Sequence, residues 1–458
     1  MTQTVQTLLI LGASGDLAAR LLMPAFGQLV QERPGEHVRL VGAGSEEWTQ
    51  ARWRKAVRAS FAAAGASGPA VERVLAETVY LSADVTNPDD LTRLLEKCEG
   101  TPAIYFALPP AISALACKAL EKVDLPAGTQ LALEKPFGTD RRSAAALNTQ
   151  VLKLVPEDQV QRIDHFLGRS TVLNLLGLRF ANRIFEPLWS AEHIASVDIV
   201  YDEQLALEGR ARYYDKAGAL IDMIQSHLLQ VLAVLAMEAP ASIDAQDLRD
   251  AKATVLRATR VWNDDPTTSS RRGRYLAGEI DGKKLPAYAK ENGVDPALKT
   301  ETLAEVTFEI ENWRWAGVPF TLRSGKALGV RRREIVITFK APQHLPHGLH
   351  GKIEPTVLRL QLAPDAMSLE LNINGPGDPH EIDRSVLSAD FGPGQLQAYG
   401  EVLSGVFDGD PSLSVRGDTA EQCWRIVAPV IAAWKADKVA LDGYRAGSNG
   451  PSKWKPIG

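Results

Sequence analysis

The N-terminal stretch joins a short apolar run, a glycine turn and a helical pattern, and it constrains the fold more than any other feature. Gln6–Leu11 (QTLLIL) is typical of a buried parallel strand. Gly12 follows at once, and Gly15 and Ala18 come at intervals of three. Gly12 permits a tight turn, and Gly15 lets backbone N–H groups approach a pyrophosphate at a helix N-terminus. The spacing is GxxGxxA rather than GxGxxG, but its position between a strand and a helix predicts a dinucleotide-binding fold.

Further candidates for cofactor contacts lie in the same turn. Ser14, Asp16 and Leu17 accompany Gly12 and Gly15 there. The helix that follows is predicted to bury one broad apolar face, made of Leu17, Leu21, Leu22, Ala25, Leu29 and Val30. This succession of strand, turn and helix is the context that gives the glycine motif its meaning.

The second predicted strand, Val38–Gly42, ends where a dinucleotide fold meets the adenosine ribose. An acidic residue at this place accepts hydrogen bonds from a free ribose diol, whereas a 2′-phosphate requires arginine or lysine. Ser45, Glu46 and Glu47 follow the strand, and the first basic residue is Arg52. Ser45 could also cap the next helix, with the two glutamates in its first turn, and the two interpretations are compatible.

The remaining cofactor candidates follow later predicted strands: Asp84, Val85 and Ala107. Lys135 follows another apolar run and precedes Pro136, which holds it out of the helical region. A lysine at the carboxyl edge of the sheet in such a fold commonly belongs to the active site. A surface lysine in a turn fits the same pattern.

The stretch Arg162–Asn182 places charged groups beside the start of an apolar helix. Arg162, Asp164, His165 and Arg169 come close together in it. That mixture suits a site that holds an anionic substrate next to a general base. The sequence changes character after this stretch. We therefore predict a dinucleotide-binding domain over residues 1–170 and a second domain over residues 171–458.

A long apolar helix is predicted over Gly218–Leu232, and it carries Asp222, His227 and Gln230. At about 100° per residue, Asp222 and His227 would lie roughly 140° apart on an α-helix, so they need not be a direct pair. If His227 is a base, its orienting carboxylate should come from elsewhere, and Asp164 is the candidate. A lone histidine in an apolar helix is also often a core residue, and this interpretation stays open.

From about Thr300, alternating apolar residues predict strands separated by turns rich in proline and glycine. The expected strands are Thr302–Ile310, Thr321–Arg323, Glu334–Phe339, Val357–Leu362 and Ser368–Ile373. We therefore predict an α/β Rossmann domain followed by an α+β domain with a large, mostly antiparallel sheet. Lys326 and Arg331 lie on a cationic loop between two of these strands, which is either an anion clamp or a solvated basic turn.

The composition argues against several other classes of protein. A net charge of −5 argues against a partner that is nucleic acid or an anionic membrane. No apolar run reaches the roughly 20 residues of a membrane span, and the start lacks the features of a signal peptide, so we expect a cytoplasmic protein. Cys98, Cys117 and Cys423 are isolated, which argues against disulfides and thiolate zinc sites. The three histidines of APQHLPHGLHGK have no carboxylate pair nearby, so no metal site is expected.

Together these residues resemble the glucose-6-phosphate dehydrogenase family over nearly the whole chain. The motifs that match in order are GASGDLA, YFALPP, EKPFGTD, RIDHFLG, NLLGLRFAN, EGRARYYD, ALIDMIQSHLLQ, KTET, NWRWAGVPF, LRSGKAL and AGSNGP. The resemblance implies a second domain built on a large antiparallel sheet, through which a homodimer or homotetramer assembles. It also implies oxidation of C1 of glucose 6-phosphate to the lactone, with hydride transfer to NAD or NADP, in the pentose phosphate pathway.

The same resemblance implies roles for individual residues. His227 matches the general base that takes the proton of the C1 hydroxyl, and Asp164 matches the carboxylate that orients its imidazole. His165 and Arg169 match positions that bind the phosphate. Further substrate contacts are implied for Lys135, Glu203, Asp222, Lys326 and Arg331, and Lys135 is also a catalytic and cofactor-binding candidate.

The chain departs from the family pattern at positions that bear on specificity. The family usually has tyrosine and lysine where Phe166 and Arg169 stand. The missing hydroxyl is worth about 1 kcal/mol or more, which Arg169 can offset by bidentate binding. NADP-dependent members usually have arginine after the second strand, where Ser45 and Glu46 stand here, so we expect NAD to be preferred. Other departures are Leu21, Ile221 and Ser226, where lysine, arginine and asparagine are common.

Three other interpretations compete with this one. Phe166 and Arg169 are compatible with a dehydrogenase of another hexose that bears an anion at C6. An enzyme similar to glucose–fructose oxidoreductase would share the Rossmann start and the EKP turn, but DHFLG and NWRWAGVPF argue against it. A catalytically silent paralogue would not need Asp164, His227 and Lys135, which this chain keeps.

Overall fold

The computed structural model describes residues 6–455 except 208, 210, 393–395 and 397, so Glu208 and Arg210 of the EGRARYYD motif lie outside the described residues. The chain divides into two compact units. The first comprises Met1–Arg169, Pro240–Ala251 and Gly394–Gln422, and the second comprises Ser170–Ala239, Lys252–Pro393 and Cys423–Gly458. Two later segments of the chain therefore return to the first unit.

A parallel sheet of six strands, counted over the described residues, forms the centre of the first unit. Its order is β3-β2-β1-β4-β5-β6. The strands are β1 (Gln6–Leu11), β2 (Val38–Gly44), β3 (Val79–Ser82), β4 (Thr101–Phe106), β5 (Gln130–Glu134) and β6 (Val160–Ile163). Dinucleotide-binding folds have this order, and their ligands bind at the carboxyl ends of the strands where the order reverses. The reversal lies between β1 and β4, and the predicted Rossmann fold is confirmed.

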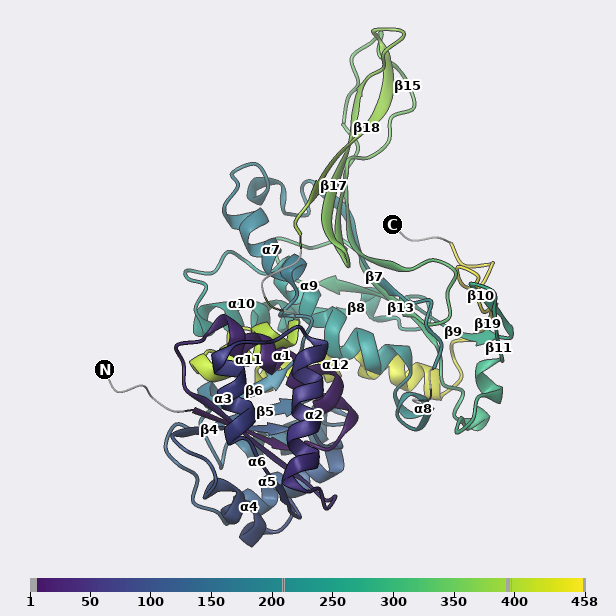
Figure 1. The fold of residues 1–458 in the computed structure, drawn as a ribbon. Helices are drawn as coiled ribbons and strands as arrows, with labels where there is room; N and C mark the ends of the chain where they lie inside the picture. The colour runs from purple at the N-terminus through teal and green to yellow at the C-terminus, as the bar shows by residue number, and fades with distance from the viewer. Residues whose placement is uncertain (1–5, 208, 210, 393–395, 397, 456–458) are drawn as a thin grey trace. The chain divides into compact units, whose positions relative to one another are not determined.

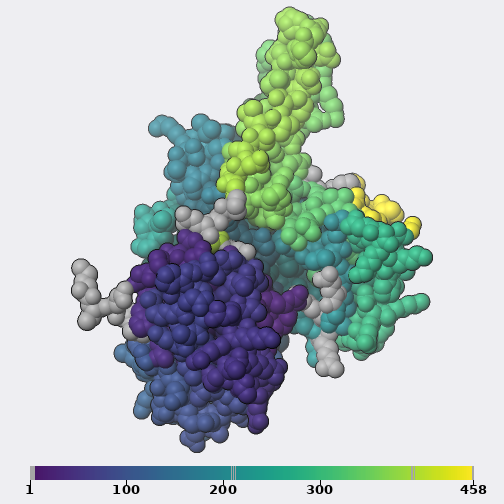
Figure 2. All heavy atoms as spheres, in the orientation of Figure 1, coloured from purple at the N-terminus to yellow at the C-terminus, as the bar shows by residue number. Residues whose placement is uncertain are grey.

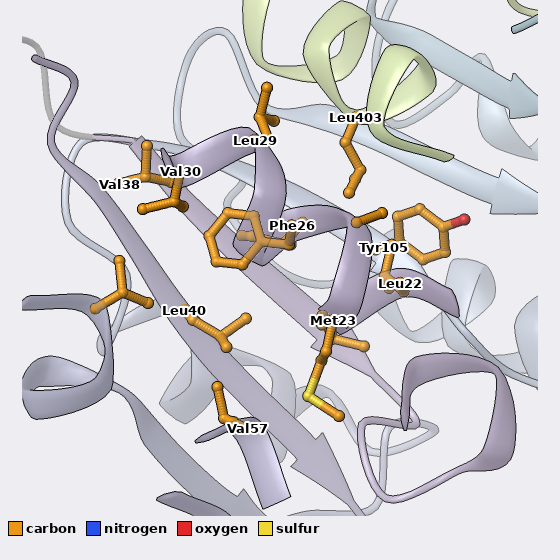
Figure 3. Close-up of a cluster of buried hydrophobic side chains, with 14 of the residues drawn as sticks. Leu22, Met23, Phe26, Leu29, Val30, Val38, Leu40, Val57, Tyr105 and Leu403 are labelled. Atoms are coloured by element: carbon orange, nitrogen blue, oxygen red, sulfur yellow. The ribbon is translucent and has the colours of Figure 1, made fainter. Parts of the chain in front are cut away.

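The first unit has an apolar core on each side of this sheet, because successive residues of β1 point to opposite faces. Leu8 and Ile10 pack with helices α1, α2, α3 and α11, whereas Leu9 and Leu11 pack with α4, α5 and α6. These helices are α1 (Met23–Glu32), α2 (Gln50–Ala63), α3 (Pro69–Glu77), α4 (Pro88–Leu95), α5 (Pro110–Leu120), α6 (Arg141–Val151) and α11 (Ala398–Asp408). Figure 3 shows Leu403 of α11 in the same cluster as Phe26, so a segment near the end of the chain completes this core.

Two local predictions for this unit are wrong. The helix after the glycine turn begins as a π-helix, η1 (Ala18–Leu22), in which each turn holds an extra residue. The α-helical spacing therefore fails there, and Leu21 is 45% exposed instead of buried. Helix α2 is capped by Thr49, whose hydroxyl accepts a hydrogen bond from the N–H of Arg52 (3.2 Å), and not by Ser45.

The second unit is built on a mixed sheet that has eleven strands among the described residues. The path is β15-β18-β17-β16-β14-β7-β13-β12-β9-β19, and β8 pairs with β12. The strands are β7 (Ile194–Asp202), β8 (Thr259–Val261), β9 (Ser270–Leu276), β12 (Leu303–Ile310), β13 (Phe320–Gly325), β14 (Arg332–Phe339), β15 (His350–Gly351), β16 (Val357–Leu362), β17 (Asp365–Asn374), β18 (Glu381–Asp390) and β19 (Leu441–Arg445). Most pairs are antiparallel, which confirms the predicted sheet, but β7 and β13 run parallel.

The hairpin of β17 and β18 extends well beyond the rest of this sheet (Figure 1). In the space-filling view the hairpin is a projecting green arm (Figure 2). Ile373, Val386 and Leu387 on it are 47%, 56% and 59% exposed. An arm that exposes large apolar side chains is a typical contact surface for another protein chain.

The apolar helix of the sequence analysis is three consecutive helices. They are α8 (Ala211–Ala219), the π-helix η4 (Leu220–Leu228) and α9 (Leu229–Ala236), and Gly218 forms a kink with a φ of 65°. The segment Tyr213–Ala236 is long and apolar enough to cross a membrane, but most of it is buried inside the protein, as in a core helix. Three further helices are α7 (Ser170–Phe180), α10 (Ala245–Ala258) and α12 (Gly417–Lys435).

Candidate active site

The glycine turn lies at the switch point of the first sheet. The N–H groups of Gly12 and Ala13 both donate to the carbonyl of Ala43 at 2.8 Å, which fixes the turn against β2. Gly12 has a φ of 87°, and a Cβ atom there would lie 2.3 Å from the carbonyl oxygen of Ala107. Only glycine fits this position. Gly15 follows in the turn, and its N–H donates to the carbonyl of Gly12 (3.0 Å).

A carboxylate is held at the end of β2, next to the turn. The hydroxyl of Ser14 donates to the carboxylate of Glu46, and this bond lowers the pKa of Glu46. The hydroxyl of Tyr80 donates to the carbonyl oxygen of Glu46 (2.9 Å). Gly44 makes room for this arrangement, because a Cβ atom there would lie 2.7 Å from the Ser14 hydroxyl oxygen. Ser45 beside it is exposed.

Four other predicted cofactor residues have modest local roles. Asp16 is exposed and pairs with Arg20 (3.2 Å). Leu17 is half-buried, and Val85 is buried in the apolar core. The carboxylate of Asp84 accepts hydrogen bonds from the N–H (2.9 Å) and the hydroxyl (2.7 Å) of Thr86, so it shapes the turn after β3.

Lys135 lies directly after β5, and the peptide bond to Pro136 is cis. The preceding Glu134 is half-buried, and burial raises the pKa of its carboxyl group. Tyr105 of β4 and Tyr399 of α11 both donate hydrogen bonds to this carboxylate from their hydroxyl groups. Lys135 therefore follows a residue that is fixed from two sides.

Asp164 and His165 follow β6 at the same edge of the sheet. Asp164 is 1% exposed, and its carboxylate accepts a hydrogen bond from the N–H of Phe166 (2.9 Å). The ring of His165 stacks on Tyr399, with 5.4 Å between ring centres and 14° between planes. The guanidinium of Arg169 lies over the ring of Phe166, 4.5 Å from its centre. The ring of Phe166 thus provides the face on which the guanidinium of Arg169 packs.

Arg162, which the sequence groups with this cluster, has a structural role in the first unit. It is 1% exposed, and its guanidinium forms a bidentate pair with Glu157 at 2.8 Å and 3.1 Å. It also donates to the side chain of Asn148 (3.0 Å). Its charge is therefore satisfied inside the protein.

Charged residues of the second unit meet where β7 and β13 end. These strands are parallel, and Asp202 pairs in register with Gly325, so Glu203 and Lys326 emerge at the same edge. The ammonium of Lys326 lies 2.7 Å from one carboxylate oxygen of Glu203. The guanidinium of Arg333 donates to the other at 3.2 Å. Glu203 is therefore held between two cations.

Arg331 and Arg333 differ in a way that the sequence does not indicate. Arg331 is exposed and takes part in no ion pair within the described part of the chain. Arg333 is the guanidinium that contacts Glu203, and it also lies over the ring of Tyr201, 4.6 Å from its centre. Arg331 precedes β14, whereas Arg333 is the second residue of that strand, so the two can be told apart only when the start of the strand is known.

His227 and Asp222 both lie on the π-helix η4, which packs against β12 and β13. His227 is 1% exposed, and the hydroxyl of Tyr213 donates to the carboxylate of Asp222 (3.2 Å). In a π-helix, hydrogen bonds join residues five apart. Asp222 and His227 are five apart, so they share one face, and the predicted separation of 140° is wrong. Such π turns occur frequently at functional sites.

Gly44, Tyr399 and Arg333 are among the residues that contact predicted site residues but are not themselves predicted as site residues. Gly44 ends β2 and lies two residues beyond the predicted strand Val38–Gly42, and a glycine in a strand is only a weak signal of close approach. Arg333 belongs to the recognised run of arginines. Tyr399 has no signal, because its segment joins the first unit from far along the chain.

Two domain families match this chain. The glucose-6-phosphate dehydrogenase NAD binding domain matches residues 9–174, and the glucose-6-phosphate dehydrogenase C-terminal domain matches residues 176–457. A glucose-6-phosphate 1-dehydrogenase of Rhizobium meliloti is 38% identical, and the alignment covers 97% of this chain and 94% of that protein. The corresponding enzyme of Bacillus subtilis is 36% identical over 98% and 96% of the two chains.

Two solved structures are similar over nearly the full length. The glucose-6-phosphate 1-dehydrogenase of Mycobacterium avium has a TM-score of 0.84 and 34% identity, with 97% of this chain and 95% of that chain covered. A glucose-6-phosphate dehydrogenase in complex with its substrate glucose-6-phosphate has a TM-score of 0.88 and 29% identity, with 99% and 97% covered. The chain described here therefore belongs to the glucose-6-phosphate dehydrogenase family.

Proposed function

We propose that this chain oxidises C1 of D-glucose 6-phosphate to 6-phosphoglucono-1,5-lactone, the first oxidation of the pentose phosphate pathway. The observation that carries the proposal is the match of both family domains, which together span residues 9–457. The edges of the two sheets support it, because each presents charged side chains of the kind that the reaction needs.

The first unit fits a nicotinamide dinucleotide. The turn at Gly12 leaves no room for a side chain, as a backbone that approaches a pyrophosphate requires. The turn from Gly12 to Leu17, with Ser14, Gly15 and Asp16, would hold the phosphates. Ala107, Lys135, Asp84 and Val85 would line the remainder of the site. When bound, the nicotinamide accepts the hydride that leaves C1.

His227 acts as the general base in this proposal, and Asp164 orients its imidazole. A neutral imidazole is a competent base near pH 7 and can take the proton of the C1 hydroxyl as the carbonyl forms. A buried carboxylate next to the imidazole would stabilise the imidazolium that results. The burial of both side chains supports these roles, since each is 1% exposed.

The phosphate of the substrate is assigned to His165 and Arg169. The stacking of His165 on Tyr399 and of Arg169 on Phe166 limits the rotamers of both side chains before a ligand binds. The sugar hydroxyls are assigned to Lys135, Glu203, Asp222 and Lys326, with Arg331 at the margin. Arg333 is added as the residue that holds Glu203 from its other side.

We infer that NAD is preferred to NADP. Glu46 is held by Ser14 at the place where the adenosine ribose would lie, and a carboxylate there accepts from a free diol and repels a 2′-phosphate. The nearest arginine after β2, Arg52, lies over the ring of Trp48, 4.4 Å from its centre. In this structure the guanidinium of Arg52 therefore packs on an aromatic ring.

A matrix of sugars against both dinucleotides tests the activity, with the absorbance of the reduced nicotinamide as the readout. We expect the highest kcat/KM for glucose 6-phosphate with NAD. Equal efficiency with glucose would contradict the phosphate assignment, and a higher kcat/KM with NADP would contradict the cofactor preference. A higher value for another C6-phosphorylated hexose would favour the alternative substrate that Phe166 and Arg169 suggest.

The His227→Asn variant tests the general base. We expect kcat to fall by about a hundredfold to ten-thousandfold, while the dissociation constant of glucose 6-phosphate changes little. His193→Asn is the matched control, because His193 belongs to the same unit and its side chain is only partly buried, at 38% exposed. A normal kcat in His227→Asn would remove this residue from the mechanism.

A further inference from the structure

The second unit contains a half-open cavity of about 540 Å³ that the proposed reaction does not use. It lies between the end of α8, the start of η4 and the end of α12. None of the residues assigned to the sugar or its phosphate lines it. Ligand pockets typically measure roughly 300–1,000 Å³, so this one can hold a metabolite of nucleotide size.

The rim of the cavity carries lysines that no carboxylate balances. Lys216 of α8 and Lys435 of α12 are exposed, and neither takes part in an ion pair with any described residue. Lys299 and Arg272 also line the cavity, but both pair with Asp437, at 2.5 Å and 3.1 Å. The rim therefore has an excess of positive charge.

The acidic residues deeper in the cavity are already engaged. The carboxylate of Asp215 accepts hydrogen bonds from the hydroxyl of Tyr288 and the N–H of Asp295, both at 2.7 Å. Glu301 is 8% exposed, and its carboxylate accepts from the N–H of Leu220 (3.0 Å). An incoming anion would thus meet the lysines before it meets a free carboxylate.

Glu301 makes the cavity sensitive to protons. Burial raises the pKa of this carboxyl group to about 7, against the smaller opposing effects of the hydrogen bond from the Leu220 N–H and of the charge of Arg272. Glu301 also interacts electrostatically with Tyr214 and Tyr288, and the charged groups that line the cavity with it are Asp215, Lys216, Arg272, Lys299, Lys435 and Asp437. A bound anion would favour the neutral form of Glu301, so anion binding should be accompanied by proton uptake.

Glu301 also connects the cavity to the proposed active site. Leu220, which donates to its carboxylate, is the first residue of η4, the helix that carries Asp222 and His227. Gly218 lies two residues before Leu220, and a Cβ atom at Gly218 would lie 2.2 Å from a carboxylate oxygen of Glu301. Thr302 follows Glu301 in the chain, and its carbonyl oxygen accepts a hydrogen bond from the N–H of Lys326 (2.8 Å).

We propose that this cavity binds an organic phosphate of nucleotide size and that binding acts on η4 through Glu301. Lys216 and Lys435 hold the phosphate groups, as lysine ammonium groups commonly do. Leu220, Ile221 and the edge of Trp434 supply the apolar wall for the body of the ligand. The site is distinct from the dinucleotide turn of the first unit.

Calorimetric titration of the full chain tests the binding. The protein is first saturated with glucose 6-phosphate and the reduced dinucleotide, a pair that cannot react, so that the proposed active site is occupied. ATP and fructose 1,6-bisphosphate are the two probes, and inorganic phosphate is the third arm. We expect one further equivalent of ATP or of the bisphosphate to bind, with inorganic phosphate weaker.

Variants of the rim provide the decisive comparison. Lys216→Ala with Lys435→Ala should weaken probe binding by about tenfold or more, because two contacts to charged groups are lost. Lys283→Ala with Lys284→Ala, two exposed lysines of β11 (Lys283–Leu285), is the matched control and should bind normally. Absence of binding by both organic probes, or unchanged binding in the rim variant, would overturn the proposed site.

Two further readouts test the connection to η4. Probe affinity should fall as the pH rises from about 6 to about 8, and Glu301→Gln, which keeps an acceptor for Leu220, should abolish this dependence.

The probe should also change the KM for glucose 6-phosphate in the parent protein but not in the rim variant. This kinetic readout presupposes the proposed function, whereas the titration does not. Binding without either effect would refute the connection to η4.

Discussion

The proposed cofactor preference rests on a single carboxylate and on the residues that hold it. Glu46 would remain mobile if it only followed β2, but Ser14 binds its carboxylate and Tyr80 binds its carbonyl. Gly44 creates the space for this contact. The proposed preference for NAD would therefore depend on several residues on three strands and their turns, with Glu46 supplying the charge.

Replacing Glu46 with alanine should shift the preference toward NADP. We expect the ratio of kcat/KM for NADP to that for NAD to rise by about tenfold, because the repulsion of the 2′-phosphate and the acceptor for the ribose diol are both lost. Glu32→Ala removes an exposed carboxylate at the end of α1 and should leave the ratio unchanged. The same ratio in Glu46→Ala and in the parent would show that Glu46 does not read the ribose.

Glu301 should make the stability of the protein fall as the pH rises. Its pKa increases from an ordinary value of 4.5 to about 7 in the folded protein. Between these values the folded state holds a proton that the unfolded state has lost, so the stabilising effect of protonation is complete below about pH 4.5 and disappears as the pH passes about 7. The total effect is up to about 3 kcal/mol.

Thermal unfolding of Glu301→Gln across this range measures the effect. The glutamine cannot ionise, so the difference in unfolding free energy between the variant and the parent should grow in favour of the variant as the pH rises from about 5 to about 8. Glu279→Gln changes an exposed glutamate of the same unit and serves as the control. Parallel pH profiles for the parent and Glu301→Gln would contradict the raised pKa.

At the scale of elements, the strands of this chain are predictable and several helices are not. Strand Val357–Leu362 has the predicted bounds, and the other strands from Thr302 to Asn374 differ by a few residues. Alternation reports the pleat of a strand directly. The π-helical turns at Ala18–Leu22 and Leu220–Leu228 give no such signal, because their apolar spacing is close to that of an α-helix.

The same limit applies to the candidate site. Motifs at strand ends, such as Gly12 and Lys135, could be placed because parallel strands bring their carboxyl ends to one edge. The relative position of Asp222 and His227 on their helix could not be predicted, because it depends on the π-helical geometry. The sequence also could not predict which arginine near the cationic loop contacts Glu203, because that contact depends on the register of β14.

The turn after β1 provides a prediction at this scale. Gly12→Ala would force a Cβ atom to 2.3 Å from the backbone of Ala107 at a φ of 87°. The Cβ atom is fixed to the backbone of residue 12 and its neighbour is a backbone carbonyl oxygen, so the turn itself must move. We expect a loss of about 2–4 kcal/mol in stability together with weaker binding of the dinucleotide. Denaturant unfolding with and without NAD measures both.

Gly35→Ala is the control for this experiment, because a Cβ atom there meets nothing within 4 Å. It should unfold and bind NAD like the parent. If Gly12→Ala behaved in the same way, the close approach of the turn to Ala107 would not constrain the cofactor site.

At the scale of the whole molecule, the two units are interleaved along the chain. Segments 240–251 and 394–422 return to the first unit after the second has begun. The second of these segments supplies α11, whose Leu403 completes the core in Figure 3 and whose Tyr399 stacks on His165. The Rossmann unit therefore depends on residues far outside the stretch that the glycine motif identifies, and a fragment that ends at residue 170 would lack part of its core.

We further infer that the exposed arm of the second sheet joins two copies of this chain. The family resemblance implies assembly through this sheet, and the arm has the exposed apolar side chains that such a contact requires. Val386 and Leu387 are adjacent on β18, so they point to opposite faces, and both are more than half exposed. A free monomer would leave both faces of the hairpin in water.

The paired substitution Val386→Glu with Leu387→Glu should therefore dissociate the protein. We expect the dissociation constant of the oligomer to rise by about a hundredfold or more, because buried interface positions do not tolerate unpaired charges. Sedimentation of the parent and the variant over a range of concentrations measures it. Ile243→Glu, which changes a 72% exposed isoleucine outside the arm, controls for the added charge. A variant that sediments like the parent would place the contact elsewhere, and a monomeric parent would show that the arm has no partner of its own kind.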